Sequence, residues 1–104
     1  MTDQNPMDVL QKEAPEVAAT FDQFIESLIR LKGLDPKTKQ LVYIGIKSAQ
    51  GETTAVQFHV PMAKKLGATR EEIRDTILVT LSTSGLNGVV SCLPMALRVY
   101  DEGP

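Results

Sequence analysis

The sequence contains little of what most chemical sites require. It has one cysteine, Cys92, one histidine, His59, and no tryptophan among its 104 residues. A single cysteine cannot form an internal disulfide, and together with one histidine it falls short of the four side chains of a structural zinc site. We therefore expect no metal centre and no bound cofactor, and a cytoplasmic location is the default expectation.

Excess charge and long apolar runs are also missing. The 11 basic and 13 acidic residues give a formal net charge of −2, and aromatic residues make up only 5%. The basic patch with interleaved aromatics that is typical of nucleic-acid binders is absent. No apolar run is long enough to span a bilayer, and residues 1–16 are polar and acidic, unlike a signal peptide. We expect neither a nucleic-acid partner nor a membrane.

What the sequence does contain is hydrophobic residues at helical spacing. The hydrophobic fraction of 42% is sufficient for a packed core, and a chain of this length forms one compact domain, here residues 1–104. Asn5 and Pro6 begin a short helix over residues 5–14. The next helix, over residues 15–33, has an apolar stripe at steps of three and four. The stripe consists of Val17, Phe21, Phe24, Ile25 and Leu28.

Two later segments are ambiguous because their central residues favour strands. Residues 34–51 contain "LVYIGI" and residues 69–85 contain "ILVTL". The helix starts decide both cases, since Asp35-Pro36 begins one segment and Thr69 with Glu72 has capping-box spacing in the other. Two more helices are predicted over 52–67, with a kink at Pro61, and over 86–103, where Pro94 is a second kink candidate. The prediction is an all-α bundle of five to six helices.

Two of the predicted helices are apolar on nearly all sides. A monomer of this size exposes too much surface to bury both of them. We therefore expect other copies of the chain to cover part of that surface, so that the protein is a homo-oligomer.

The most specific motif is the run from His59 to Ile73, "HVPMAKKLGATREEI", in which the spacing is H-x-x-x-A-x-x-x-G-A-T-x-E-E-I. It follows "LDPKTKQLVYIGIKSAQG" and precedes "STSGLNG". In these motifs the chain resembles the carboxymuconolactone decarboxylase family, which includes the alkylhydroperoxidase AhpD, over roughly residues 17 to 100. The resemblance implies an AhpD-like all-helical fold that assembles into homo-trimers or homo-hexamers.

The resemblance also implies a redox site that this chain has largely lost. Redox members of the family have a Cys-x-x-Cys pair, a histidine four residues after the second cysteine, and a glutamate on the preceding helix. Here the two cysteine positions hold Glu52 and Ala55, the glutamate position holds Gln40, and only His59 remains. Glutamate and alanine cannot form a disulfide, so peroxide reduction by this pair of positions is excluded.

His59 is the centre of the predicted site, with Glu52 and Gln40 as its candidate partners. A histidine on an apolar face can instead be a core residue held by one hydrogen bond. Glu52 lies seven residues before His59, which places both on one helix face, but it can equally serve as a helix-start carboxylate. Gln40 can orient His59 or a ligand carbonyl, or it can be a solvated helix residue.

Three functions remain open at this point, and whether the chain is an enzyme is open with them. The first is a cofactor-free decarboxylase of a small organic acid or lactone, with His59 as proton shuttle. The second is a non-catalytic binding or assembly homologue. The third is a thiol-dependent peroxidase using Cys92, although a lone cysteine in such a helix is usually a small buried hydrophobe. The first requires a cation for its anionic substrate, for which we considered Arg30, Arg74 and Arg98.

Overall fold

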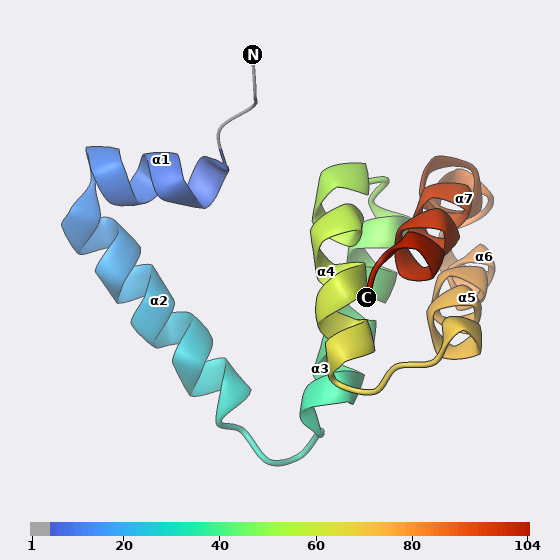
Figure 1. Cartoon of the computed structure of the whole chain (residues 1–104), viewed down its shortest axis with the longest axis horizontal. Coiled ribbons are helices and arrows are strands. Elements are labelled where there is room, and N and C mark those ends of the chain that lie inside the picture. The colour runs from blue at the N-terminus through green and yellow to red at the C-terminus, as the bar shows by residue number, and fades with distance from the viewer. Residues whose placement is uncertain (1–4) are drawn as a thin grey trace. The chain divides into compact units, whose positions relative to one another are not determined.

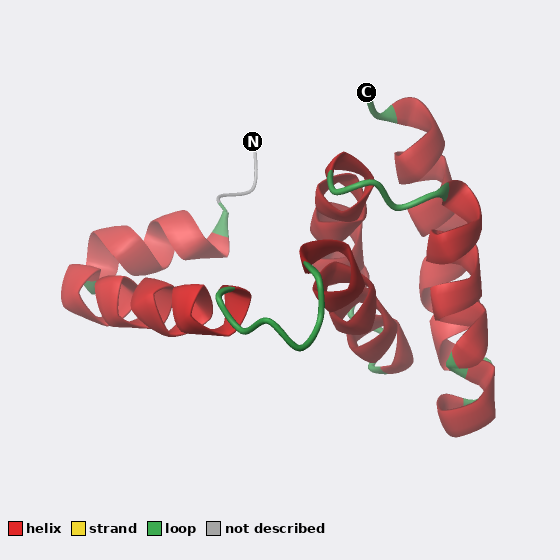
Figure 2. Ribbon diagram, turned by 90° about the horizontal axis from the view of Figure 1, so that it is seen from below, coloured by secondary structure: helices red, strands yellow, loops and turns green. Residues whose placement is uncertain are grey.

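The computed structural model describes residues 5–104, in which every regular element is a helix (Figure 1, Figure 2). The chain divides into two compact units at the boundary between Gly33 and Leu34. The all-α prediction is confirmed, and no strand occurs in the described residues. The expectation of a single domain over residues 1–104 stays a prediction.

The first unit contains two helices, α1 (Pro6–Glu13) and α2 (Pro15–Ile29). The side chain of Asn5 accepts a hydrogen bond from the backbone N–H of Met7 at 2.8 Å, so α1 begins where the sequence indicates. Ala18 is the only residue of α2 that is buried. The apolar stripe predicted for this helix is therefore largely exposed.

The second unit consists of α3 (Pro36–Ala49), α4 (Thr53–Lys65), α5 (Arg70–Val79), α6 (Leu81–Ser84) and α7 (Asn87–Glu102). Helix α3 packs against α4 and α5, and α7 packs against α4 and α5. These contacts enclose a core of aliphatic side chains. Its buried members are Ile44, Val56, Val60, Ala63, Ala68, Ile73, Ile77, Cys92 and Ala96.

Caps decide that both ambiguous segments are helical. Asp35 accepts a hydrogen bond from the backbone N–H of Thr38 at 2.7 Å, which begins α3. Thr69 and Glu72 form the predicted capping box at the start of α5. In "LVYIGI" the side chain of Ile44 is completely buried, so packing of one helix face outweighs the strand propensity of the segment.

One predicted helix, over residues 69–85, is interrupted. At Thr80 the backbone N–H bonds to the carbonyl of Ile77 at 3.1 Å, and the hydroxyl bonds to the same carbonyl at 2.6 Å. The chain tightens there, and the single turn α6 follows as a separate element. The described residues thus contain six helices and the single helical turn α6, in agreement with the predicted five to six helices. By contrast, α4 continues through Pro61 and α7 through Pro94.

The turn between α3 and α4 reverses the chain. Gly51 has a φ of 73°, a left-handed conformation that favours glycine. The N–H of Glu52 bonds to the carbonyl of Lys47 at 2.9 Å, which is the wide hydrogen bond of a Schellman motif. Helix α4 consequently returns alongside α3, so that residues from the two helices face each other.

No helix in residues 5–104 combines the length and the apolar composition needed to cross a bilayer.

Candidate active site

The α3–α4 hairpin brings His59 against Gln40. The two side chains are 19 positions apart, and His59 Nδ1 lies 2.8 Å from Gln40 Oε1. An amide carbonyl oxygen can only accept, so Nδ1 donates its hydrogen to it. In the neutral imidazole the other ring nitrogen, Nε2, then holds a lone pair and can accept a proton.

The ring of Tyr43 fixes the plane of the imidazole. Tyr43 lies one turn after Gln40 on α3, and its ring stacks on His59 with the centroids 3.8 Å apart and the planes 26° apart. Tyr43 is also close to a cation, since Lys47 Nζ lies 5.8 Å from its ring centroid. Both the hydrogen bond and the stack hold His59 in one orientation.

Burial lowers the pKa of His59 below its ordinary value of 6.5, and the positive charge of Lys47 lowers it further. The imidazole is therefore mainly neutral at pH 7, the form that can accept a proton. His59 is only partly buried.

Glu52 directly precedes α4, and Ala55 lies in the first turn of that helix. Glu52 is exposed at the N-cap position, and its side chain makes no capping hydrogen bond. Within residues 5–104 no hydrogen bond joins Glu52 to His59. The structure thus brings Gln40 to His59 and leaves Glu52 at the start of α4. The predicted role of Glu52 as a partner of His59 stays a prediction.

Cys92 is completely buried in α7. Burial raises the pKa of its thiol, and the neighbouring hydroxyl of Ser48 opposes that shift only in part. A reactive thiolate requires an exposed, electropositive setting, so this environment favours the small buried hydrophobe over a nucleophile.

In the described residues, no hydrogen bond or ion pair joins His59 to any of the three arginines considered as substrate clamps. Arg30 pairs with Glu26 at 3.4 Å within the first unit, and Arg74 pairs with Asp75 at 2.8 Å. Arg98 is exposed on α7. The cation that does act on His59 is Lys47.

Sequence reasoning missed both Tyr43 and Lys47, although their spacing was a usable signal. Gln40, Tyr43 and Lys47 lie at positions i, i+3 and i+7 of one helix and so share a face. Once residues 34–51 are assigned as a helix and Gln40 is identified as a site position, the spacing places Tyr43 and Lys47 on the same face as Gln40.

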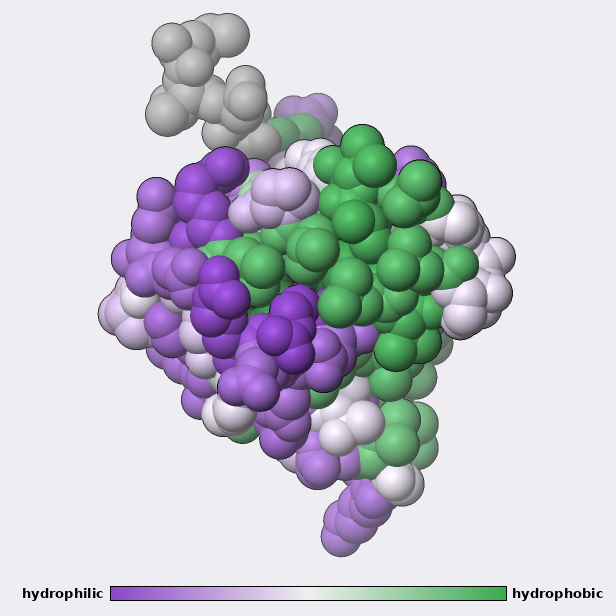
Figure 3. Space-filling view, turned by 90° about the vertical axis from the view of Figure 1, so that its right-hand side faces the viewer, coloured by the Kyte–Doolittle hydropathy of each residue, from purple (hydrophilic) through white to green (hydrophobic). Residues whose placement is uncertain are grey.

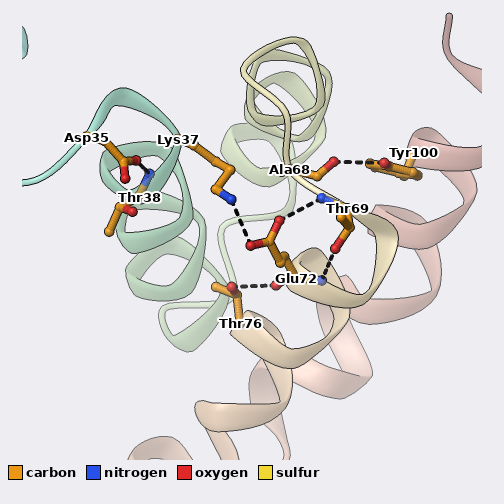
Figure 4. Close-up of polar contacts among 8 residues, drawn as sticks. All are labelled: Asp35, Lys37, Thr38, Ala68, Thr69, Glu72, Thr76 and Tyr100. Carbon is orange, nitrogen blue, oxygen red and sulfur yellow. Dashed lines mark hydrogen bonds and ion pairs between the residues drawn. The ribbon is translucent and has the colours of Figure 1, made fainter.

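A second polar cluster joins the start of α3 to the start of α5 and has a structural character (Figure 4). Lys37 Nζ contacts Glu72 at 2.9 Å, and Glu72 also accepts the N–H of Thr69 at 2.8 Å. The pKa of Glu72 is lowered chiefly by this backbone N–H and then by Lys37. The hydroxyl of Tyr100 donates to the carbonyl of Ala68 at 2.8 Å nearby. Each of these groups has a protein partner.

Neither a metal cluster nor the groove beside α3 adds to the site. Among the described residues no group of three or more His, Cys, Asp or Glu side chains is placed to hold a metal ion. An open apolar groove of about 420 Å³ lies between α3 and α5–α6, and His59 does not line it. The chemistry we assign therefore concerns the His59 cluster and not this groove.

Comparison with known proteins places this hairpin in a family. The protein is similar to the uncharacterized protein MJ0742 of Methanocaldococcus jannaschii, with 33% identity over 77% of this chain and 78% of that protein. It is also similar to an uncharacterized 15.0 kDa protein of Paracoccus denitrificans, from the nqo9-nqo10 intergenic region, with 30% identity over 92% of this chain and 74% of that protein. Residues 15–98 match the sequence model of one family. The chain belongs to the carboxymuconolactone decarboxylase family.

Proposed function

We propose that the protein is a cofactor-free decarboxylase of a small organic acid, either a carboxylated lactone or a β-keto acid, with His59 as its proton shuttle. The observation that supports this is the 2.8 Å contact of His59 Nδ1 with Gln40 Oε1, which leaves Nε2 for proton transfer. Family membership supports the reaction class, and the loss of the cysteine pair opposes the redox chemistry.

The proposed step is a proton transfer to carbon. Loss of carbon dioxide breaks the bond between the carboxylate and its carbon, and the electron pair stays on that carbon, delocalised into an adjacent carbonyl. Neutral His59 first takes up a proton from solvent on Nε2, and the resulting imidazolium donates that proton to this carbon and becomes neutral again. In total one carboxylate and one proton become carbon dioxide and a C–H bond. Gln40 accepts the Nδ1 hydrogen throughout, so it orients the ring without moving a proton.

The test uses His59→Ala together with a matched neighbour, Gln57→Ala, an exposed residue of the same helix. Carbon dioxide release is measured over a panel of lactone acids and β-keto acids. We expect His59→Ala to lower the rate by about 10² to 10⁴, the usual contribution of a general acid, and Gln57→Ala to leave it unchanged. Equal rates in wild type and His59→Ala would contradict the proposal.

The same assays separate the alternatives. Peroxide consumption with a thiol donor that disappears in Cys92→Ala would instead support the thiol-dependent peroxidase. The absence of both activities would favour the non-catalytic binding or assembly homologue.

We further propose that the protein assembles with copies of itself, as a homo-trimer or homo-hexamer. Large apolar side chains of the second unit are exposed: Val79 is 67%, Leu86 67% and Val90 72% exposed. Figure 3 displays hydrophobic residues gathered over one side of the face formed by α5, α6 and α7. Surfaces of this kind usually mark contact sites. Light scattering should give a multiple of the chain mass that Val90→Asp reduces, and a monomeric wild type would oppose the proposal.

A further inference from the structure

Lys47 extends the site on the α3 side. It lies seven residues after Gln40 and four after Tyr43, on the same face of the helix. Its Nζ is 5.8 Å from the centroid of the Tyr43 ring, and that ring stacks directly on His59. A positive charge therefore lies near the Tyr43 ring that stacks on His59.

Two other partly buried lysines of the second unit use their charge within the protein. Lys37 pairs with the carboxylate of Glu72 at 2.9 Å. Lys64 donates to the carbonyls of Tyr100 and Gly103 at 2.8 Å and 3.0 Å. Lys47 is partly buried as well, yet no carboxylate within residues 5–104 lies at ion-pair distance from it. An ammonium that contacts an aromatic ring and has no carboxylate partner can bind an anion.

We propose that Lys47 is the anion-binding residue of this site, and that it holds the carboxylate of a small organic acid while the reacting carbon of that acid contacts His59. This rests on the function proposed above, for which it supplies a cation. Lys47 would also make the site select anionic ligands over neutral ones, because neither the neutral Gln40 nor the Tyr43 ring requires an anion.

The arrangement couples ligand binding to protonation of His59. In the free protein the charge of Lys47 opposes protonation of the imidazole. A bound carboxylate neutralises that charge and adds a negative one near the ring, so it raises the pKa of His59. By linkage, a protonated His59 then binds the carboxylate more tightly. Gln40 is neutral, so Lys47 is the charged side chain of the packed face of α3 through which this coupling acts.

The test is NMR titration of the His59 imidazole, whose signal needs no assignment because the chain has one histidine. The probe is levulinate, a keto acid that does not lose carbon dioxide readily, and methyl levulinate is its uncharged analogue. For the wild type we expect levulinate to raise the pKa of His59 and the ester to leave it unchanged. Saturating salt should weaken the levulinate effect, because the contact is electrostatic.

Three variants identify the residue responsible. Lys47→Met keeps the aliphatic stem and removes the charge, so levulinate affinity should fall by about tenfold or more. It should also raise the pKa of His59 in the free protein. Lys47→Arg should retain binding, and Lys65→Met, at an exposed lysine of α4, should behave as wild type. Circular dichroism confirms that each variant is folded.

Distinct results overturn the two proposals. Equal levulinate affinity in wild type and Lys47→Met, equal binding of the ester, or no response of His59 to levulinate would each overturn the assignment of Lys47. Decarboxylation that depends on His59 and is unaffected by Lys47→Met would overturn it too, while the proposed function would stand. Levulinate binding that depends on Lys47, without turnover of any acid, would support the anion site and contradict the decarboxylase.

Discussion

Helix α3 has polar side chains in two settings that differ in how fully they are used. Near its start, Lys37 and Glu72 satisfy each other at 2.9 Å. Farther along, Gln40 occupies one nitrogen of His59, but the described residues offer no partner to Nε2 and no carboxylate to Lys47. The first setting ties two helices together, and the second has hydrogen-bonding and charge capacity left for a ligand. Changes in the first should alter stability, and changes in the second should alter chemistry.

The largest effect on folding is expected at Gly88, where α7 approaches the end of α3 closely. A Cβ atom at Gly88 would lie 2.8 Å from the carbonyl oxygen of Ser48 and 2.9 Å from the hydroxyl oxygen of Thr80. Gly88→Ala should therefore lower the free energy of unfolding by about 1 to 3 kcal/mol, as measured by urea denaturation. Gly33→Ala is the matched control, since a Cβ there meets nothing within 4 Å. Equal free energies of unfolding for the two variants would show that α3 and α7 can move apart to accommodate the added Cβ atom without loss of stability.

A smaller effect is expected in the saturated setting. Thr69→Ala removes the hydroxyl that accepts the N–H of Glu72 at 3.0 Å. It should lower the free energy of unfolding by about 1 kcal/mol and leave the NMR titration of His59 unchanged. Thr54→Ala, at an exposed position in the first turn of α4, serves as control and should not destabilise. A shift of the His59 titration in Thr69→Ala would mean that the two settings are coupled.

The smallest effect on folding, and a clear effect on chemistry, is expected for Gln40→Glu. The carboxylate is nearly isosteric with the amide and would lie 2.8 Å from His59 Nδ1, so it raises the pKa of His59.

The same variant changes how stability depends on pH. In the wild type the lowered pKa means that the unfolded chain binds the proton more readily. Stability should therefore fall as the pH drops below the unfolded value of 6.5 and through the lower folded pKa. Gln40→Glu should remove or reverse this slope in urea titrations at several pH values. An unchanged slope would mean that another group is responsible.

Most of the fold could be predicted because local signals agree with the packing. Asp35-Pro36 and the Thr69–Glu72 capping box determine the two segments with strand-like centres. The break at Thr80 could not be predicted, since neither glycine nor proline marks it. It arises from a hydroxyl that bonds back to Ile77, an option that every helical threonine has.

The site was predictable only in part. The resemblance indicated Gln40 and His59, and the geometry brings them together. The role of Glu52 stays a prediction, because a shared helix face over seven residues spans two turns, about 10 Å along the axis, and does not by itself ensure contact. Lys47 is recognisable only by its spacing from Gln40 once residues 34–51 are assigned as a helix. Which residues of α3 face His59 depends on how α3 and α4 are aligned, and that alignment follows from the turn at Gly51 and the core packing.

Three of the four side chains of the candidate site belong to one helix, α3. Helical geometry fixes the intervals between Gln40, Tyr43 and Lys47, and a loop movement cannot change them. The fourth, His59, lies on the neighbouring helix, α4. The internal shape of the centre therefore depends mainly on two coordinates, the separation of α4 from α3 and the sliding of one helix along the other. Substitutions anywhere along that seam can retune the centre as a whole without touching any of its four members.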